Sequence, residues 1–149
     1  MRSPSARGLR IAIVASRFHA ELTEDLLRGA RELLTECGVG SRGTKVFRCP
    51  GSFELPQVAE RLARSKRWDA IVCLGVVIRG ETPHFEYVAA EAARGIQDVA
   101  LRWGLPVAFG VLTTDTERQA RARAGGRLGN KGRSAALAAV EMALLFKKI

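Results

Sequence analysis

The stretch GVVIRGETPHFEYVAAEAA, residues 75–93, contains the clearest signals for the fold. An apolar run over residues 70–74 precedes it and predicts a buried strand that ends where the stretch begins. Thr82 is the expected N-cap of a helix, with Pro83 at the first helical position. His84 would then lie on the first turn, at the carboxyl end of a parallel strand, where open α/β sheets usually hold their chemistry. The helix is indicated by apolar residues at helical spacing, namely Phe85, Val88, Ala89, Ala92, Ile96 and Val99.

Strand-like and helix-like segments alternate along the rest of the chain. Short β-branched runs predict further strands at residues 9–15, 44–48 and 106–112. The expected helices cover residues 22–37, 55–63, 83–104, 115–124 and 134–148. Such alternation indicates right-handed βαβ units and a parallel sheet that helices cover on both faces. The predicted fold is therefore an α/β, three-layer α/β/α sandwich of the flavodoxin-like kind, with a four-stranded parallel sheet.

The carboxyl-terminal third has weaker boundary signals. Thr114 or Asp115 is the expected cap of the fourth helix, and Gly125 with Gly126 would end it. A glycine-rich turn to Gly132 leads to the last helix. Its inward face is predicted to consist of Leu137, Val140, Leu144 and Leu145.

Length and composition favour an ordinary globular protein. The chain has 149 residues, of which 47% are hydrophobic and 26% are charged. We expect a short, disordered basic arm over residues 1–8 and one domain over residues 9–149. No apolar run approaches the ~20 residues of a membrane span, and the first residues do not resemble a secretory signal. Three cysteines without metal-ligand spacing favour free thiols in a reducing cytoplasm.

The net charge of +9 makes nucleic acid a partner to consider. Only residues 118–133 concentrate the charge, with six cations and no acid. This segment is either a solvated helix face, the commoner case, or a phosphate clamp, for which the planar arginine fork is suited. Nucleic-acid-binding, GxGxxG and P-loop patterns are absent. An anionic small substrate fits this local cluster better than a polymer does.

The loops at the strand ends contain residues with two open interpretations each. His84 is either a surface or capping histidine or a proton shuttle. Phe18 and Phe53 are either core residues or a stacking platform for a flat heterocycle. Glu54 either stabilises a helix start or accepts hydrogen bonds from ligand hydroxyls. His19 is interpreted as a loop residue without an assigned role.

Four runs together resemble the lumazine synthase family, whose members make the riboflavin precursor 6,7-dimethyl-8-ribityllumazine. They are residues 75–93 above, ASRFHAELT at 15–23, CPGSFELP at 49–56 and FGVLTTDTERQARARAGGRLGNKG at 109–132. The runs cover nearly the whole chain in the family's order. The resemblance implies the strand order 2-1-3-4. It also implies condensation of 5-amino-6-(D-ribitylamino)uracil with 3,4-dihydroxy-2-butanone 4-phosphate, releasing phosphate and water, without a metal or an organic cofactor.

The resemblance also assigns roles to residues of this chain. His84 would be the catalytic general acid/base, and Phe18 would stack on the pyrimidine ring. Residues implied to hold the ribitylaminouracil are Phe18, Ser52, Phe53, Glu54, Val76, Val77, Ile78, Phe109 and Lys131. Residues implied to hold the butanone phosphate are Glu81, Thr82 and Arg123. Phe109, Arg123 and Lys131 would come from a neighbouring subunit.

The family resemblance further implies an assembly. It predicts a homopentamer with active sites at subunit interfaces. A 60-subunit shell of such pentamers is a second candidate assembly, which the uninterrupted turn GGRLGNKG favours. Riboflavin synthase is a candidate partner, whereas nucleic acid and membranes are not expected. Two other classes of function stay open on the residues alone. One is a flavodoxin-like, flavin-binding protein without catalysis, and the other is a basic scaffold or RNA-binding protein.

Overall fold

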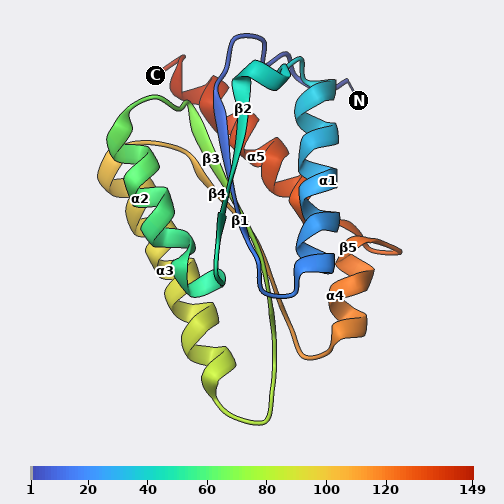
Figure 1. Ribbon diagram of the computed structural model, residues 1–149. Coiled ribbons are helices and arrows are strands. Elements are labelled where there is room, and N and C mark those ends of the chain that lie inside the picture. Colours follow the sequence, from blue (N-terminus) through green and yellow to red (C-terminus); the bar gives the residue numbers. More distant parts are fainter. Residues whose placement is uncertain (1) are drawn as a thin grey trace.

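A four-stranded parallel sheet forms the middle layer of the computed structural model, which describes residues 2–149. The strands are β1 (Ile11–Ser16), β2 (Thr44–Cys49), β3 (Ala70–Ile78) and β4 (Val107–Thr114). Their order in the sheet is β2-β1-β3-β4, and every neighbouring pair is parallel. This confirms the predicted fold class and strand order. All four carboxyl ends point to the lower end of the sheet in Figure 1.

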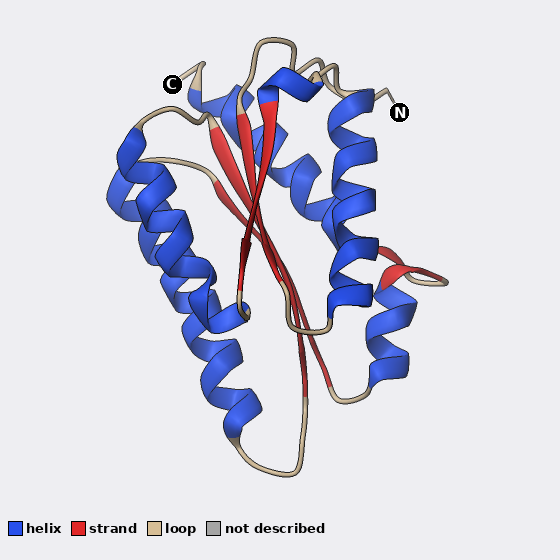
Figure 2. Ribbon diagram, in the orientation of Figure 1, coloured by secondary structure: helices blue, strands red, loops and turns tan. Residues whose placement is uncertain are grey.

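Helices cover both faces of the sheet (Figures 1 and 2). One face carries α1 (Ala20–Glu36) and α5 (Lys131–Phe146), and the other carries α2 (Leu55–Ser65) and α3 (His84–Trp103). The short helix α4 (Glu117–Arg123) and the hairpin of β5 (Ala124–Gly126) and β6 (Gly129–Asn130) lie beside α1. Two 3-10 turns, η1 (Ser41–Gly43) and η2 (Ser52–Glu54), flank β2. The hairpin was not foreseen, because three glycines around one turn give no strand signal.

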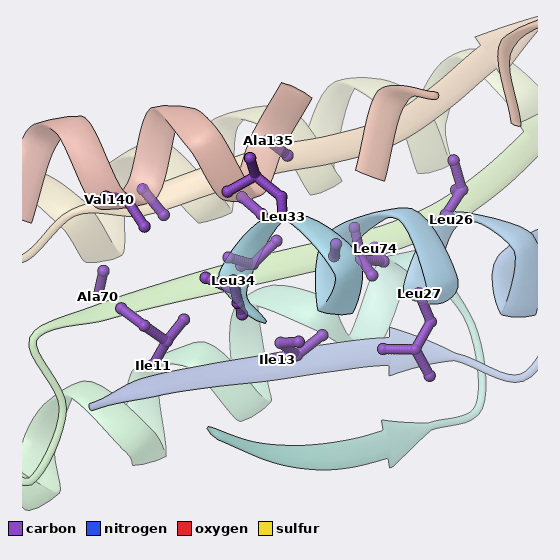
Figure 3. Packing of buried hydrophobic residues seen from close by; sticks show 14 of the residues in the cluster. Ile11, Ile13, Leu26, Leu27, Leu33, Leu34, Ala70, Leu74, Ala135 and Val140 are labelled. Atoms are coloured by element: carbon purple, nitrogen blue, oxygen red, sulfur yellow. The ribbon is translucent and has the colours of Figure 1, made fainter. Parts of the chain in front are cut away.

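Each face of the sheet has its own hydrophobic core. Leucines of α1 fill the space between β1, β3 and α5, as Figure 3 shows for Leu26, Leu33 and Leu34. Helices α1 and α5 approach closely because Gly132 has no side chain, and a Cβ there would overlap the backbone carbonyl of Leu26. This contact fixes the start of α5, and therefore Lys131, against α1.

Several boundaries differ from the predicted ones for identifiable reasons. β3 does not end at Gly75 but continues to Ile78, because it pairs with β4 as far as Ile78 with Thr114. The N-cap of α3 is Pro83 rather than Thr82, and Thr82 Oγ1 accepts a long 3.5 Å hydrogen bond from the His84 backbone N–H. Helix α4 is capped by Thr116, not by Thr114 or Asp115.

Three side chains explain where the last two helices begin. Thr116 and Gln119 form a reciprocal capping box, which satisfies backbone N–H groups at both positions. Asn130 caps α5 by accepting a 3.0 Å hydrogen bond from the Arg133 N–H, so α5 begins three residues before the predicted Ser134. Leu145 was expected to face inward, but its side chain is 46% exposed.

The amino-terminal segment makes contacts with the domain. Ala6, within the arm expected over residues 1–8, is buried, and its N–H donates to the carbonyl of Cys37 at 2.7 Å. Ser3 Oγ donates to Glu36 at 3.4 Å. Met1 lies outside the described residues. The described part of this segment therefore packs near the carboxyl end of α1 rather than extending as a free arm.

Candidate active site

A pocket of about 490 Å³ opens at the carboxyl ends of the strands, on the face of the sheet that α2 and α3 cover. Three loops build it: the β1–α1 loop, the β2–α2 loop with η2, and the β3–α3 loop with the first turns of α3. Nine of the predicted site residues line this one pocket: Phe18, Ser52, Phe53, Glu54, Val76, Val77, Ile78, Thr82 and His84. Parallel strands bring these distant segments together because their carboxyl ends meet at one edge.

Two phenyl rings are presented to solvent at the rim of the pocket. Phe18 is 66% exposed and Phe53 is 49% exposed, so the interpretation of either as a core residue is wrong. The backbone N–H of Phe18 donates to the carbonyl of Pro50 at 3.1 Å, which ties the β1–α1 loop to the β2–α2 loop. Exposed aromatic faces beside an apolar pocket suit a flat ring that can stack on them.

His19 supports the position of Phe18. It adopts the left-handed backbone conformation with φ of 55°, at the N-cap position of α1. Its ring meets the ring of Phe18 edge-on at 4.7 Å between centroids. His19 also lines the pocket, a role that the sequence did not indicate.

His84 is the first residue of α3 and is exposed to the pocket opening. Phe85, Tyr87 and Val88, which follow on the first turns, also line the pocket, and they were not predicted as site residues. The sequence indicated Phe85 and Val88 only as apolar positions of a helix; both are half-buried and also pack against the hydrophobic core on this face of the sheet. Glu81 is exposed in the loop before His84 and does not line the pocket.

A second pocket of about 520 Å³ lies along β4 and α4. It contains the three remaining predicted residues, Phe109, Arg123 and Lys131. The Nη1 of Arg123 donates to the carbonyl of Gln119 at 3.0 Å, which holds this guanidinium against its own helix. The two pockets have no lining residue in common. Within one chain, the histidine and the predicted phosphate clamp are therefore in separate places.

Arg79 lies between the two pockets. Its Nε donates to Oδ1 of Asp115 at 2.8 Å, and its Nη1 donates to Oε1 of Glu86 at 3.4 Å. The guanidinium also lies over the ring of Phe85, 4.6 Å from the centroid. The hydrogen bonds to Asp115, the largest cause, and to Glu86 raise the pKa of Arg79.

The thiols do not supply a nucleophile to the first pocket. Burial raises the pKa of the Cys49 thiol to about 11, with the nearby Glu54 carboxylate as a second cause. Burial also raises the pKa of Cys73 and of Cys37. Such thiols are protonated near neutral pH and react slowly. Among residues 2–149, no group of three or more His, Cys, Asp and Glu side chains could hold a metal ion.

Comparison with known proteins decides between the open functions. The sequence model of 6,7-dimethyl-8-ribityllumazine synthase matches residues 8–147. The chain belongs to the lumazine synthase family. A lumazine synthase from Syntrophus aciditrophicus (strain SB) is 51% identical over 144 residues, which cover 97% of this chain and 94% of the relative. The resemblance inferred from the four sequence runs is confirmed.

Membership of the lumazine synthases fixes the reaction. The enzyme condenses 5-amino-6-(D-ribitylamino)uracil with 3,4-dihydroxy-2-butanone 4-phosphate and forms 6,7-dimethyl-8-ribityllumazine, phosphate and water, a transferase step of riboflavin biosynthesis. Its substrates are small molecules, which removes the flavin-binding and RNA-binding alternatives as the main function. No helix in the described part of the chain has the length and apolar character needed to cross a membrane.

Proposed function

We propose that each active site of this lumazine synthase is built from two chains. One chain contributes the first pocket with His84, and its neighbour contributes the second pocket with Arg123. The observation that supports this arrangement is the complete separation of the two pockets in one chain. β4 is an edge strand of the sheet, so the second pocket is accessible to a neighbour. A ring of head-to-tail contacts would join the two kinds of pocket at every interface.

The first pocket holds the ribitylaminouracil in this proposal. Phe18 stacks on the pyrimidine ring, and the backbone of residues 76–78 binds the polar edge of the uracil. The ribityl chain lies against residues 52–54, where the carboxylate of Glu54 accepts hydrogen bonds from hydroxyls. Phe109 and Lys131 of the neighbouring chain would close over this substrate. The exposure of the Phe18 ring and the apolar lining of the pocket support the stacking arrangement.

The phosphate of the second substrate would lie between the β3–α3 loop and the neighbour. Glu81 and Thr82, in the loop before α3, would face this phosphate, and Arg123 binds it through its planar fork. The hydrogen bond from Arg123 to Gln119 O leaves other N–H groups of the guanidinium free to bind an anion. The cationic segment 118–133 provides a favourable potential for the dianionic group.

His84 moves the protons of the reaction. The substrate amine attacks the butanone carbonyl to give an imine, phosphate leaves by elimination, and ring closure follows. Each step transfers a proton, and imidazole is the side chain best suited to this near neutral pH. Its place on the first turn of α3, at the pocket opening, puts it where the two substrates would meet. Holding both substrates in register is expected to provide much of the remaining acceleration.

The assembly belongs to the same proposal. We expect a homopentamer, and the uninterrupted turn at residues 125–132 favours further packing into a 60-subunit shell. A cytoplasmic location agrees with three free, buried thiols. Riboflavin synthase remains the predicted partner.

Mixed assemblies test the shared site. His84→Ala and Arg123→Ala chains are co-expressed in equal amounts and assemble at random. About one interface in four would then combine an intact His84 with an intact Arg123, by the counting that head-to-tail ring symmetry implies. Mixed rings should recover up to roughly that fraction of wild-type activity. Recovery no better than the average of the two parent variants, in rings shown to be mixed by mass spectrometry, would place both residues in one chain's site.

A further inference from the structure

Two buried hydroxyl groups close to Gly75, those of Ser16 and Ser52, have no hydrogen-bond partner within residues 2–149. Ser16 is 1% exposed and Ser52 is 5% exposed. A buried hydroxyl without a partner costs free energy, and most buried polar groups in proteins are paired. Two such groups in one place therefore call for an explanation other than packing.

The two hydroxyls lie on the face of the sheet that forms the pocket. Side chains alternate along a strand, so Ser16 points to the same face as Val14, which packs in the core beneath α2 and α3. By the same alternation Gly75 shares a face with Val77, and Val77 lines the pocket. Ser52 itself lines the pocket from the opposite side.

Gly75 keeps the space between the hydroxyls open. A Cβ at Gly75 would overlap Ser52 Oγ and would lie 3.1 Å from Ser16 Oγ. Both oxygens are therefore close to one point above Gly75. The backbone of Gly75 is that of an ordinary strand, so glycine is required here for close approach rather than for conformation. The arrangement combines two hydrogen-bonding groups with room for them to move toward each other.

We propose that Ser16 is a positioning residue that orients the Ser52 hydroxyl toward a polyol hydroxyl of the bound substrate. Ser16 Oγ–H donates to Ser52 Oγ, and Ser52 Oγ–H donates to an oxygen of the ribityl chain. A serine hydroxyl can donate and accept at the same time, and a small rotation about each Cα–Cβ bond brings the pair together. The relay rests on the proposed location of the ribityl chain beside Ser52.

The surroundings of the two hydroxyls favour a neutral ligand group. Neither hydroxyl forms a hydrogen bond with a charged side chain in the described part of the chain. The surrounding residues, such as Val14, Leu55 and Cys73, are apolar and buried. In such surroundings a hydroxyl is a suitable partner, whereas an unpaired charge would be costly to bury. The free enzyme therefore bears an unpaired pair of hydroxyls that a polyol-bearing substrate satisfies.

Ser16→Ala tests this pair of hydrogen bonds by two measurements, ligand affinity and thermal stability. Dissociation constants are measured for 5-amino-6-(D-ribitylamino)uracil alone and for an analogue that has an unsubstituted alkyl chain in place of ribityl. The constant for the ribityl compound should rise by about 2- to 12-fold, the range of one net hydrogen bond, while that for the alkyl analogue stays unchanged. The thermal midpoint of the ligand-free assembly should stay equal or rise, because an unpaired buried hydroxyl has been removed.

Thr23→Val is the matched control for stability. The Thr23 hydroxyl is also buried, but it has a partner, the carbonyl of His19 at 3.2 Å. Its removal should lower the thermal midpoint. A similar fall for Ser16→Ala, or an equal change in affinity for both ligands, or no change for either, would overturn the relay.

Ser52→Ala separates this proposal from the proposed site. If Ser52→Ala weakens binding of the ribityl compound and Ser16→Ala does not, the relay is wrong and the ribityl location stands. If Ser52→Ala and Glu54→Gln both leave that affinity unchanged, the ribityl chain does not lie beside them, and the proposed location itself is wrong.

Discussion

The guanidinium of Arg79 connects the two pockets of one chain through its ion pair with Asp115. The Nε–Oδ1 distance is 2.8 Å, and Asp115 lines the second pocket. The same guanidinium lies over Phe85, which lines the first. Arg79 anchors the loop that leads to His84, since its backbone N–H donates to the carbonyl of Thr114 at 2.9 Å. Its guanidinium adds the contacts with Asp115 and Glu86. In the proposed ring, this ion pair would link the pockets of two successive active sites.

Arg79→Met should lower kcat/KM while changing stability little. Arg79 and Asp115 are 45% and 66% exposed in the chain, and exposed ion pairs typically contribute only ~0.2–1 kcal/mol. Misplacing a catalytic group by ~1 Å, however, can cost ~10²-fold in rate. We expect a loss of about tenfold or more, measured by steady-state kinetics. Asp115→Asn should cause a comparable loss, and the double variant should be no worse than the more impaired single variant.

The matched control for Arg79 is Arg94→Met. Arg94 is exposed on α3, forms a 3.9 Å ion pair with Glu91 and lines neither pocket. Its removal should leave kcat/KM unchanged. Fully additive losses for Arg79→Met and Asp115→Asn would show that the two residues act independently and that the ion pair does not position the loop.

His84→Ala should slow lumazine formation by up to ~10²–10⁴-fold, the usual contribution of a positioned acid/base. Binding of the ribityl uracil should be nearly unchanged, because the residues proposed to stack on it and to bind its hydroxyls are intact. Single-turnover kinetics and equilibrium binding measure the two effects separately. His19→Asn is the comparison variant, since asparagine tolerates the left-handed backbone at that position. Equal losses for both variants would remove the special role of His84.

The sheet and much of the first pocket follow from local sequence patterns. Buried parallel strands appear as short β-branched runs, and these located all four main strands. Phe18 and Phe53 come soon after the ends of β1 and β2, which predicted their place at the carboxyl edge of the sheet. The end of β3 was harder to predict from the sequence, because Gly75 resembles a strand end when its pairing with β4 is unknown.

Other parts of the site depend on contacts that a single sequence does not indicate. A period of 3.6 residues shows which side chains share a helix face, but not whether that face covers a core or a pocket. Phe85 and Val88, which were predicted only as helical positions, pack against the core and also line the first pocket. Arg79 meets Asp115 across 36 residues of sequence, and nothing local marks that pair. Likewise, the unpaired hydroxyls of Ser16 and Ser52 appear only when β1, η2 and Gly75 are brought together.

Stability at high pH should depend on Cys49. The folded-state pKa of its thiol is raised to about 11 from 9.0, mainly by burial. Above about pH 9 the unfolded chain loses this proton and the folded chain retains it, so stability falls as pH rises from 9 toward 11. The loss is about 2 kcal/mol or less. Urea unfolding of wild type and Cys49→Ala at pH 8 and pH 10.5 should show a smaller drop in the variant. Identical drops in the two proteins would argue against this assignment.

Arg123→Ala should affect the two substrates unequally. In the proposed site Arg123 binds only the phosphate, so the KM for the butanone phosphate should rise far more than the KM for the ribityl uracil. Loss of a charge-assisted hydrogen bond costs roughly 1.5–3 kcal/mol, or about one to two decades in affinity. Arg123→Lys should recover only part of this, because lysine lacks the bidentate fork.

Arg127→Ala distinguishes a specific clamp from the general positive charge of the segment. Arg127 is an exposed cation four residues from Arg123, but it does not line the second pocket. Its removal should change the KM for the butanone phosphate only slightly, and this small effect should disappear at high salt, because screening removes long-range attraction between exposed charges. The effect of Arg123→Ala should persist at high salt if the guanidinium binds the phosphate directly. Equal, salt-sensitive effects of the two substitutions would mean that the segment attracts the anion without binding it directly. Equal increases in the KM of Arg123→Ala for both substrates would assign Arg123 to the fold or the interface.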